Sequence, residues 1–359
     1  MKTRTAIAID LLRQMIATPS VSRNETETAD LLYAFLEQQG AAPQRLYNNV
    51  WCRSEEFDPA RPTLLLNSHH DTVRPAAGYT RDPHEPAIEG DRLYGLGSND
   101  AGASAVSLIQ TFLKFRCAPL PFNLLLAITA EEECSGEHGF RATLPELGKI
   151  DMGLVGEPTK MQAAIGERGL VVLDCTAHGK SGHAARNEGV NALYIATDDI
   201  MQLRSFRFER TSKLLGPIGI AVTQIEAGTQ HNVVPDTCRF VVDIRTTDAY
   251  TNEETVELLR TALQSECTPR STRIRASALD TNHPMARAAI AGGSELFVSP
   301  TTSDMALMPF PTLKMGPGDS ARSHTADEYI LLSEIEEGIA GYEKFIENLV
   351  KEYGWKTLG

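Results

Sequence analysis

Five segments of the chain carry histidine or carboxylate side chains of the kinds that bind divalent metal ions. They are His69 and Asp71 in SHHD, Asp100 in GLGSNDAGAS, Glu131–Glu133 in TAEEECSG, Glu157 in VGEPT and His324 in GPGDSARSH. All except Asp100 follow a short apolar run that is typical of a buried β-strand. Ligand sites of open parallel sheets form outside the carboxyl ends of the strands. We therefore expect these segments to meet in one crevice, where their nitrogen and oxygen donors suit zinc or a similar divalent ion.

The SHHD segment offers two histidines, and strand geometry separates them. Side chains alternate across a strand, so His69 and Asp71 should point to the same face and His70 to the opposite face. A carboxylate beside a ligand imidazole can accept its second N–H, which fixes the tautomer. This predicts His69 as a metal ligand, Asp71 as the residue that orients it and His70 as a structural neighbour. A pair of strand-end histidines without a functional role is the alternative.

The other candidates are ambiguous when each is taken alone. Asp100 lies where a loop becomes a helix, so it could cap that helix or bridge two cations. The three carboxylates of Glu131–Glu133 repel one another unless cations or water relieve them, and a solvated acidic turn is the alternative. Glu157 could be an ordinary strand-end residue, and His324 could be an inert loop histidine. Their joint occurrence favours a metal centre, because two zinc ions that share a carboxylate can hold and activate water.

The elements that would position these residues follow an α/β pattern. Residues 4–16 and 25–39 have helical periodicity, and later apolar strands alternate with helices, which predicts a mainly parallel sheet. Near residue 166 the order becomes β-α-β-β-α-β, the split βαβ arrangement of ferredoxin-like domains. TRIRASALD is its predicted final strand. We therefore predict one domain of residues 1–166 and 280–359, which carries the candidate ligands, with an inserted domain of residues 167–279.

Composition excludes several classes of protein. The chain has 34 basic and 47 acidic residues, a net charge of −13, which argues against nucleic-acid binding because that relies on Lys and Arg at phosphates. No stretch approaches the roughly eighteen apolar residues that a membrane span needs, and the N-terminus does not resemble a signal peptide. The six cysteines form no Cys-x-x-Cys pair, so we expect reduced thiols in a cytoplasmic protein.

The ordered set of motifs resembles a known family. SHHDTV, GLGSNDAGAS, TAEEECSG, VGEPT, GERG, HGKSGHAA, QHNVVPD, DIR, TSD and GPGDSARSH are together similar to the zinc-dependent peptidases and deacylases that include acetylornithine deacetylase and succinyl-diaminopimelate desuccinylase. The resemblance implies two zinc ions per subunit, with cobalt as a substitute. It assigns His69 and Glu157 to one ion, Glu133 and His324 to the other, and Asp100 as the bridge.

The resemblance also implies catalytic and substrate-binding roles. Glu132 would be the general base, Asp71 would orient a ligand, and His183 would reach the neighbouring subunit's site and stabilise the tetrahedral oxyanion. The residues implied to contact substrate are Arg168, His231, Asn232 and Arg245. The sequence departs from many relatives in SNDAGAS, where they have Asp-Met-Lys-Gly, and in His70, where a small residue or Thr is common.

These implied roles describe a homodimeric amidohydrolase that acts on a small N-acyl amino acid, with residues 1–166 and 280–359 as its catalytic domain and residues 167–279 as its lid and dimerisation domain. GPGDSARSHTADEY looks most like acetylornithine deacetylase, so arginine biosynthesis is the first expectation. N-succinyl- or N-acetylcitrulline, succinyl-diaminopimelate and dipeptides are the alternative substrates. A non-catalytic metal-binding or amino-acid-binding homologue is the alternative from another class; loss of Glu132 or of a ligand would mark it, and neither is lost.

Overall fold

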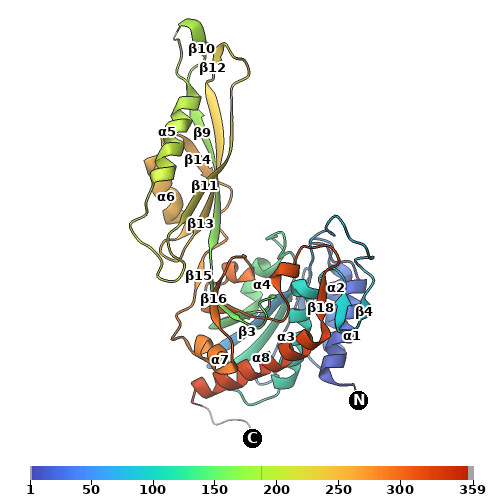
Figure 1. The fold of residues 1–359 in the computed structure, drawn as a ribbon. Coiled ribbons are helices and arrows are strands. Elements are labelled where there is room, and N and C mark those ends of the chain that lie inside the picture. Colours follow the sequence, from blue (N-terminus) through green and yellow to red (C-terminus); the bar gives the residue numbers. More distant parts are fainter. Residues whose placement is uncertain (1, 187, 355–359) are drawn as a thin grey trace. The chain divides into compact units, whose positions relative to one another are not determined.

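The computed structural model describes residues 2–186 and 188–354 (Figure 1). Its described residues form two compact units. The first, here called the sheet unit, comprises the residues up to Ile165, Leu279–Phe297 and the residues from Ser303 onward. The second, here called the inserted unit, comprises Gly166–Ala278 and Val298–Thr302. The chain therefore enters the inserted unit within strand β8 (Ala163–Glu167) and leaves it after β15 (Ser277–Ala278).

A central sheet organises the sheet unit. The strand order is β1-β2-β6-β3-β7-β17-β8. β6, β3, β7 and β17 run parallel to one another, while β1, β2 and β8 join as antiparallel strands at the edges. The four central strands are almost wholly buried, and β3, β6 and β7 accordingly contain apolar runs, whereas β17 is the short segment Thr-Leu-Lys. The predicted α/β class with a mainly parallel sheet is confirmed. The bounds are β1 (Gln44–Leu46), β2 (Asn49–Arg53), β3 (Thr63–His69), β6 (Asn123–Thr129), β7 (Met152–Val155), β16 (Leu296–Ser299, paired with β8) and β17 (Thr312–Lys314).

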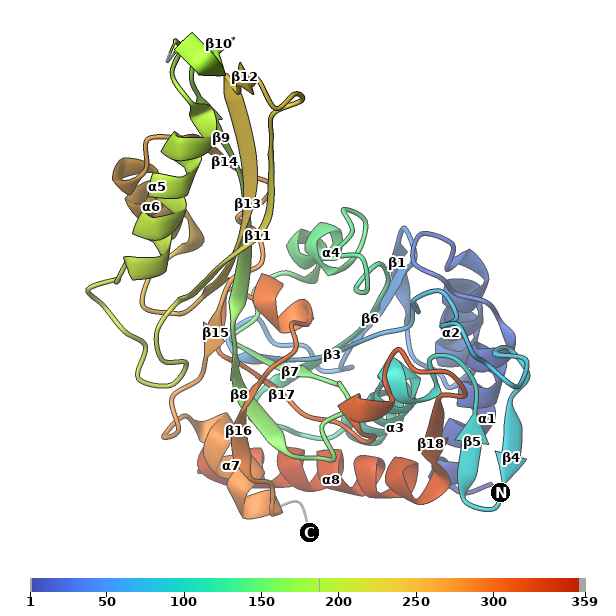
Figure 2. The same ribbon diagram turned by 45° about the horizontal axis from the view of Figure 1, so that its top comes forward.

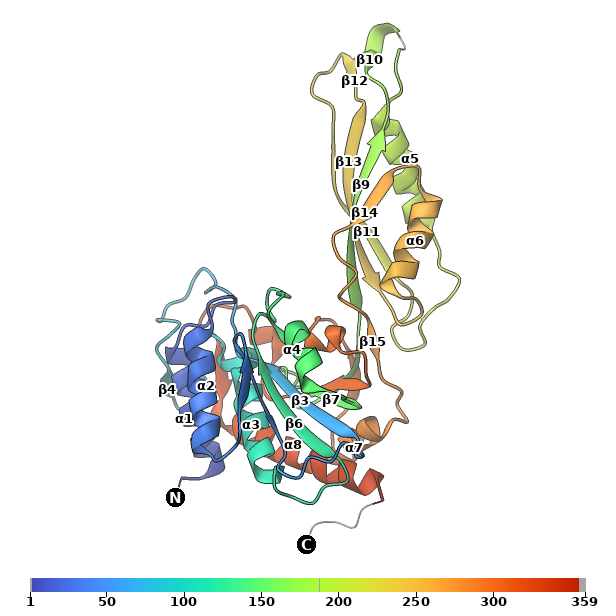
Figure 3. The same cartoon turned by 180° about the vertical axis from the view of Figure 1, so that it is seen from behind.

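Helices cover both faces of this sheet (Figure 2). On one face α3 packs against α1 and α8, and α7 packs against α8. On the other face α4 and the short turn η3 (Asp304–Leu307) contribute Phe140, Leu147 and Met305 to a core with Leu65 and Leu125 of the strands. Figure 3 shows α1 and α2 side by side, and α2 contacts β2, the strand next to the β1 edge of the sheet. The helices are α1 (Arg4–Ala17), α2 (Thr26–Gln38), α3 (Ala103–Phe115), α4 (Phe140–Leu147), α7 (Pro284–Gly292) and α8 (Leu332–Glu352).

A small three-stranded sheet lies beside the main one. It pairs β5 (Arg92–Tyr94) with β4 (Ala87–Glu89) and with β18 (Tyr329–Leu331). The loop after β5 leads to the turn η1 (Ser98–Gly102), and the loop before β18 holds the turn η4 (Ser320–Arg322). The pairing of β18 with β5 therefore brings the segment around residue 324 close to the segment around residue 100.

The inserted unit has the predicted split βαβ order. Its sheet order is β11-β13-β9-β14, with every neighbouring pair antiparallel. Alternate residues of β9 face a core beneath α5 and α6, and both helices lie on one face of the sheet (Figure 3). The elements are β9 (Gly169–His178), β10 (Gly182–His183), η2 (Ala184–Arg186), α5 (Ala192–Ser205), β11 (Gly219–Ala227), β12 (Val233–Val234), β13 (Thr237–Thr246), α6 (Asn252–Ala262) and β14 (Glu266–Pro269).

The predicted final strand of this unit was misplaced. The strand that completes the sheet is β14, which pairs with β9, whereas TRIRASALD contributes only the two residues of β15, paired with β8. The helix before it ends at Ala262, so the following residues, including Glu266, are free to form an edge strand. A four-residue edge strand that ends in proline carries too short an alternating pattern to be recognised in sequence.

Among the described residues, no helix is both long enough and apolar enough to cross a membrane.

Candidate metal centre

Parallel register brings the predicted ligands to one edge of the central sheet. His69 at the end of β3 is paired with Thr129 at the end of β6, and Asn67 is paired with Val155 at the end of β7. The segments that continue from these strands therefore begin side by side. They carry Glu132 and Glu133 after β6 and Glu157 after β7.

His69 is buried and lies between three oxygen-bearing residues. Its Nδ1 is 2.9 Å from the main-chain oxygen of Asp71 and 3.5 Å from the Asp71 carboxylate. Its Nε2 is 3.3 Å from Asp100 Oδ1 and 3.7 Å from Glu157 Oε1. With the main chain as acceptor for Nδ1–H, the lone pair of Nε2 is directed at the two carboxylates, the arrangement that a metal-binding imidazole requires.

A second imidazole approaches from the loop before β18. His324 Nε2 lies 3.1 Å and 3.2 Å from the two oxygens of Glu133 and 3.7 Å from Asp100 Oδ2. The backbone of His324 has a φ of 59°, in the left-handed region that is uncommon for residues other than glycine and that recurs at functional sites.

Asp100 thus presents one oxygen to each imidazole. Within the described residues the donor atoms form three overlapping groups, each within 4.8 Å: His69/Asp100/Glu157, His69/Glu132/Glu133 and Asp100/Glu133/His324. These donors are all imidazole nitrogens and carboxylate oxygens, which fit a pair of divalent cations that share the Asp100 carboxylate. The alternative of Asp100 as a helix cap does not apply, because α3 has Gly102 at its N-cap and no side chain caps it.

The loop that carries Asp100 is packed too closely for larger residues. A Cβ on Gly102 would lie 2.5 Å from the main-chain oxygen of Gly97, and a Cβ on Gly97 would lie 2.6 Å from the Thr72 side chain. Gly97 also has a φ of 74°, which favours glycine. These contacts explain the glycines of GLGSNDAG, and the peptide bond after Asp100 is cis.

The Asp71 carboxylate mainly supports the turn after β6. Oδ1 accepts the N–H of Glu132 at 3.0 Å, and Oδ2 accepts the N–H of Glu133 at 3.2 Å and the hydroxyl of Ser22 at 2.7 Å. Its nearest approach to His69 is longer than any of these bonds. Sequence reasoning predicted contact with the imidazole but did not foresee this anchor for Glu132 and Glu133.

His70 lies apart from the donor groups. It is buried, its Nε2 bonds to the main-chain oxygen of Asn48 at 2.8 Å, and burial lowers its pKa to about 4. His70 is therefore neutral and structural, as alternation along the strand predicts.

The electrostatics of the metal-free cluster favour added positive charge. Burial, with Glu157, Asp304 and Glu133 nearby, raises the pKa of Glu132 well above its usual value. Burial also raises the pKa of Glu157 to about 8. The ion pair with Glu133 raises the pKa of His324 to about 9. Divalent cations would relieve this repulsion and replace the protons.

The surroundings of His69 also favour positive charge. Burial by itself lowers the pKa of His69, but Asp100 and Asp71 outweigh burial and raise that pKa well above its usual value. The carboxylates around His69 therefore favour a positive charge at this position.

Sequence reasoning missed Glu328. This buried residue accepts the N–H groups of Gly97, Asn99 and Asp100 at 3.1, 2.8 and 3.0 Å. Burial raises its pKa to about 7, with a further contribution from Asp100. It holds the main chain on which Asp100 is carried. The only sequence signal was an acidic residue four positions after His324.

The five further residues implied by the resemblance lie in the inserted unit, at its two ends. Arg168 donates to the main-chain oxygens of Leu215 and Pro217, and Arg245 forms a two-bond ion pair with Asp243. His183, His231 and Asn232 lie at the far end, where His183 pairs with Val233 and Ala184 N–H donates to the main chain of Asn232.

The ten residues of β9 separate these two ends. At the usual rise per residue they span about 30 Å. A small substrate therefore cannot contact both ends of a single inserted unit.

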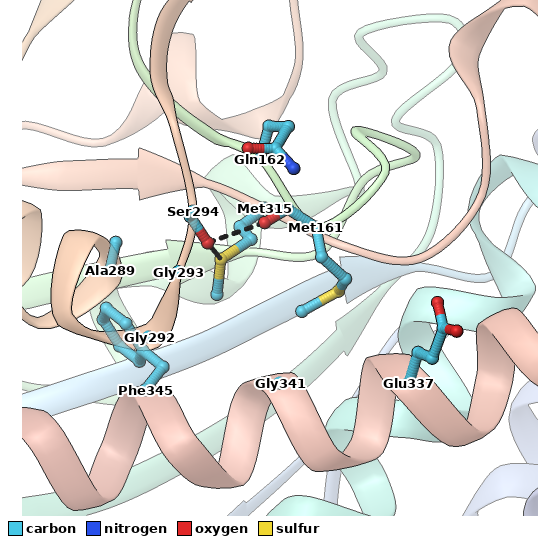
Figure 4. Close-up of a pocket in the computed structure, with 10 residues that line it drawn as sticks. All are labelled: Met161, Gln162, Ala289, Gly292, Gly293, Ser294, Met315, Glu337, Gly341 and Phe345. Carbon is cyan, nitrogen blue, oxygen red and sulfur yellow. Dashed lines mark hydrogen bonds between the residues drawn. The ribbon is translucent and has the colours of Figure 1, made fainter.

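A pocket elsewhere in the sheet unit carries little chemistry (Figure 4). It has a volume of about 160 Å³ and lies between α7, α8 and the end of β17. Its Ser294 hydroxyl donates to the Met161 main chain at 2.7 Å and approaches Met315 Sδ. Glu337 is the one ionisable group among its described lining residues, so the pocket lacks the acid–base and metal-binding groups of the cluster.

Comparisons with known proteins identify the family of this chain. The family model described as Peptidase family M20/M25/M40 matches residues 65–348. A succinyl-diaminopimelate desuccinylase of Gluconobacter oxydans is 30% identical, over 68% of this chain and 68% of that protein. An acetylornithine deacetylase of Proteus mirabilis is 27% identical, over 95% of this chain and 96% of that protein.

A solved structure extends the likeness of the fold to the whole chain. The YXEP protein of Bacillus subtilis, described as a dinuclear metal binding peptidase, superimposes with a TM-score of 0.72 at 15% identity. The match covers 99% of each chain.

Proposed function

This chain belongs to peptidase family M20, whose members hydrolyse amide bonds, and from that premise we propose that it removes the acyl group from a small N-acyl amino acid. The observation that carries this proposal is the placement of Asp100 between the imidazoles of His69 and His324, with Glu132 in the donor group of His69 and Glu133. A binding protein would not need a carboxylate with a raised pKa next to a shared-cation site.

Two divalent cations, most simply zinc, would be held by His69 with Glu157 and by Glu133 with His324, and Asp100 would contribute to both. When bound, such ions polarise the acyl oxygen and lower the pKa of water toward neutrality. The donor set also suits cobalt.

Glu132 is the proposed general base. Its carboxylate belongs to the same donor group as His69 and Glu133, and its main chain is tied to Asp71. It accepts a proton from the attacking water and returns it to the nitrogen of the leaving amine as the C–N bond breaks, so that the products are a carboxylic acid and a free amino acid. Its side chain can serve both steps, because a carboxylate can accept a proton and a carboxylic acid can donate one.

The inserted unit is proposed to serve as a lid and as the dimerisation surface of a homodimer. The 30 Å estimate for β9 supports two substrate-binding contributions from different subunits. Arg168 and Arg245 would act at one site, and His183, His231 and Asn232 would act at the partner's site. In this arrangement the exposed His183 supplies a hydrogen bond to the oxyanion.

The first candidate substrate is N2-acetylornithine, which would place the enzyme in arginine biosynthesis in the cytoplasm. The support is the near full-length match to the Proteus mirabilis enzyme. The match to the Gluconobacter oxydans enzyme keeps succinyl-diaminopimelate as an alternative. N-acyl citrulline and dipeptides are the other alternative substrates.

The test is amine release from a substrate panel. Metal-stripped protein is reloaded with zinc, cobalt or manganese and assayed on acetylornithine, acetyl- and succinylcitrulline, succinyl-diaminopimelate and dipeptides. We expect the highest kcat/KM for acetylornithine. A higher value for another member would reassign the substrate, and bound metal with no amine release on the whole panel would refute the enzymatic proposal.

A further inference from the structure

The inserted unit brings together two cysteines that are far apart in sequence. Cys267 of β14 lies directly opposite Cys175 of β9 in the antiparallel register. Both side chains are buried, with exposed fractions of 4% and 1%, and both are free thiols. They lie on the core face of the sheet, beneath α5 and α6.

The hydrogen-bonding pattern of the two strands determines what this pair can do. Arg270 N–H donates to the main-chain oxygen of Val172 at 2.9 Å, one step beyond the last paired residues of β14. Because hydrogen-bonded and non-hydrogen-bonded pairs alternate in an antiparallel ladder, the Cys267–Cys175 pair, three steps away, is non-hydrogen-bonded. Pro269, which has no N–H, falls at a position of the same kind.

A non-hydrogen-bonded pair has the spacing that a disulfide needs. Its Cα atoms are typically about 4.5 Å apart, within the usual range of about 4.4–6.8 Å for bonded cysteines. The thiols already interact. A hydrogen bond between them raises the pKa of Cys175 and lowers that of Cys267. Cys267 is therefore the thiol that ionises first.

We propose that Cys175 and Cys267 are a redox-active pair, which hydrogen peroxide converts to a cross-strand disulfide in the folded protein. The Cys267 thiolate attacks one peroxide oxygen, the O–O bond breaks, and a sulfenic acid and water form. The Cys175 sulfur then attacks the Cys267 sulfur and releases a second water. Two thiols and one peroxide thus give one disulfide and two waters, and a dithiol reductant reverses the change.

Both the access of peroxide to the thiols and the effect of the disulfide on the fold depend on β14. This strand has four residues and lies at the sheet edge, so brief local opening admits a molecule as small as peroxide. The bond would then tie β14 to β9 and restrain that opening. Among the other cysteines, Cys238 of β13 lies opposite Ala177 of β9, and Cys52 of β2 lies opposite Leu126 of β6. Cys117 and Cys134 are exposed, and none of these four faces a second cysteine across a described strand pair.

The experiment treats the full-length protein with hydrogen peroxide, removes the oxidant with catalase, and denatures the protein in iodoacetamide before digestion without reductant. Mass spectrometry should find the Cys175 and Cys267 peptides joined, lighter by two hydrogen atoms than their sum, and separated by dithiothreitol. The Cys238→Ser variant should retain the link, and Cys267→Ser should lose it and leave Cys175 alkylated.

Oxidation of the exposed Cys117 shows that the peroxide was active. If Cys117 is oxidised while Cys175 and Cys267 are recovered alkylated, or bonded to other cysteines, the proposal is overturned. A second readout is amide hydrogen exchange of residues 264–270, which should slow in the oxidised protein and not in oxidised Cys267→Ser. Equal exchange in the oxidised and reduced proteins would refute the restraint on β14.

Discussion

Replacement of Asp71 by asparagine tests how the catalytic turn is held. The carboxylate accepts three hydrogen bonds, from the N–H groups of Glu132 and Glu133 and from the Ser22 hydroxyl. Asparagine keeps the shape but has one accepting oxygen. If that oxygen occupies the Oδ2 position, the Glu132 N–H loses its acceptor; if it occupies the Oδ1 position, two bonds are lost.

The expected cost follows from this count. A hydrogen bond to a charged group contributes about 1.5–3 kcal/mol, so one or two lost bonds should lower the free energy of unfolding by about 1.5–6 kcal/mol. Burial opposes ionisation of Asp71, but His69 and Ser22 outweigh burial and lower its pKa below the usual value. The charge therefore stabilises the folded protein at neutral pH, and this contribution is lost only as the pH falls through the lowered value.

The functional effect should separate turnover from metal binding. The main-chain oxygen of Asp71 accepts from His69 and is unaffected by the substitution. We expect kcat to fall steeply because Glu132 loses its anchor, while zinc affinity changes less. Ser22→Ala is the matched control: it removes one hydroxyl donor, leaves both N–H bonds, and should retain turnover.

Urea unfolding of the metal-free protein, zinc titration and steady-state kinetics measure these effects. If Asp71→Asn unfolds at the wild-type midpoint with an unchanged slope, the account of the turn is refuted. If zinc affinity falls as far as kcat, the role of Asp71 in orienting His69 is the larger one.

Four further results are expected. Glu132→Gln should bind metal normally but lose turnover by about 10³-fold, a typical general-base effect; near-normal turnover with full metal content would exclude Glu132 as the base. Metal affinity should rise from pH 6 to pH 9, because a cation must displace protons from Glu157 and His324, whose pKa values are about 8 and about 9 without metal. Titration calorimetry in buffers of different ionisation enthalpy should detect the release of protons when metal binds. If no protons are released at pH 7, the assignment of Glu157 and His324 as metal ligands is contradicted. The raised pKa of His324 also affects the stability of the metal-free protein. The ion pair of His324 with Glu133 should stabilise the folded protein fully below about pH 6.5, the pKa of a histidine in the unfolded chain. This stabilisation should be lost as the pH rises through about 9. Inactive His183→Ala and Glu132→Gln subunits should regain activity when mixed, since one hybrid site is intact; failure to regain it in confirmed hybrids, or full activity of a monomer, would refute action across subunits.

Local patterns in the sequence determined the frame of the site. The apolar runs of β3, β6 and β7 are continuous because those strands are buried on both faces, so their ends could be read from the change to polar residues. Parallel strands end at the same edge of the sheet, so the sequence alone predicts that His69, Glu133 and Glu157 lie close together. Strand alternation likewise separated His69 from His70.

Tertiary structure decided everything that depends on contacts between distant segments. That Asp100 faces two imidazoles depends on the pairing of β18 with β5 and on the three N–H bonds to Glu328, more than two hundred residues away in the chain. Asp71 became the anchor of the turn after β6 for the same reason. The edge strand β14, and with it the pairing of Cys267 and Cys175, was missed because four residues carry almost no periodic signal. The ends of buried strands can be predicted from local hydrophobicity in the sequence. Strand register, contacts between distant loops and cross-strand partners are determined only when the folded chain packs.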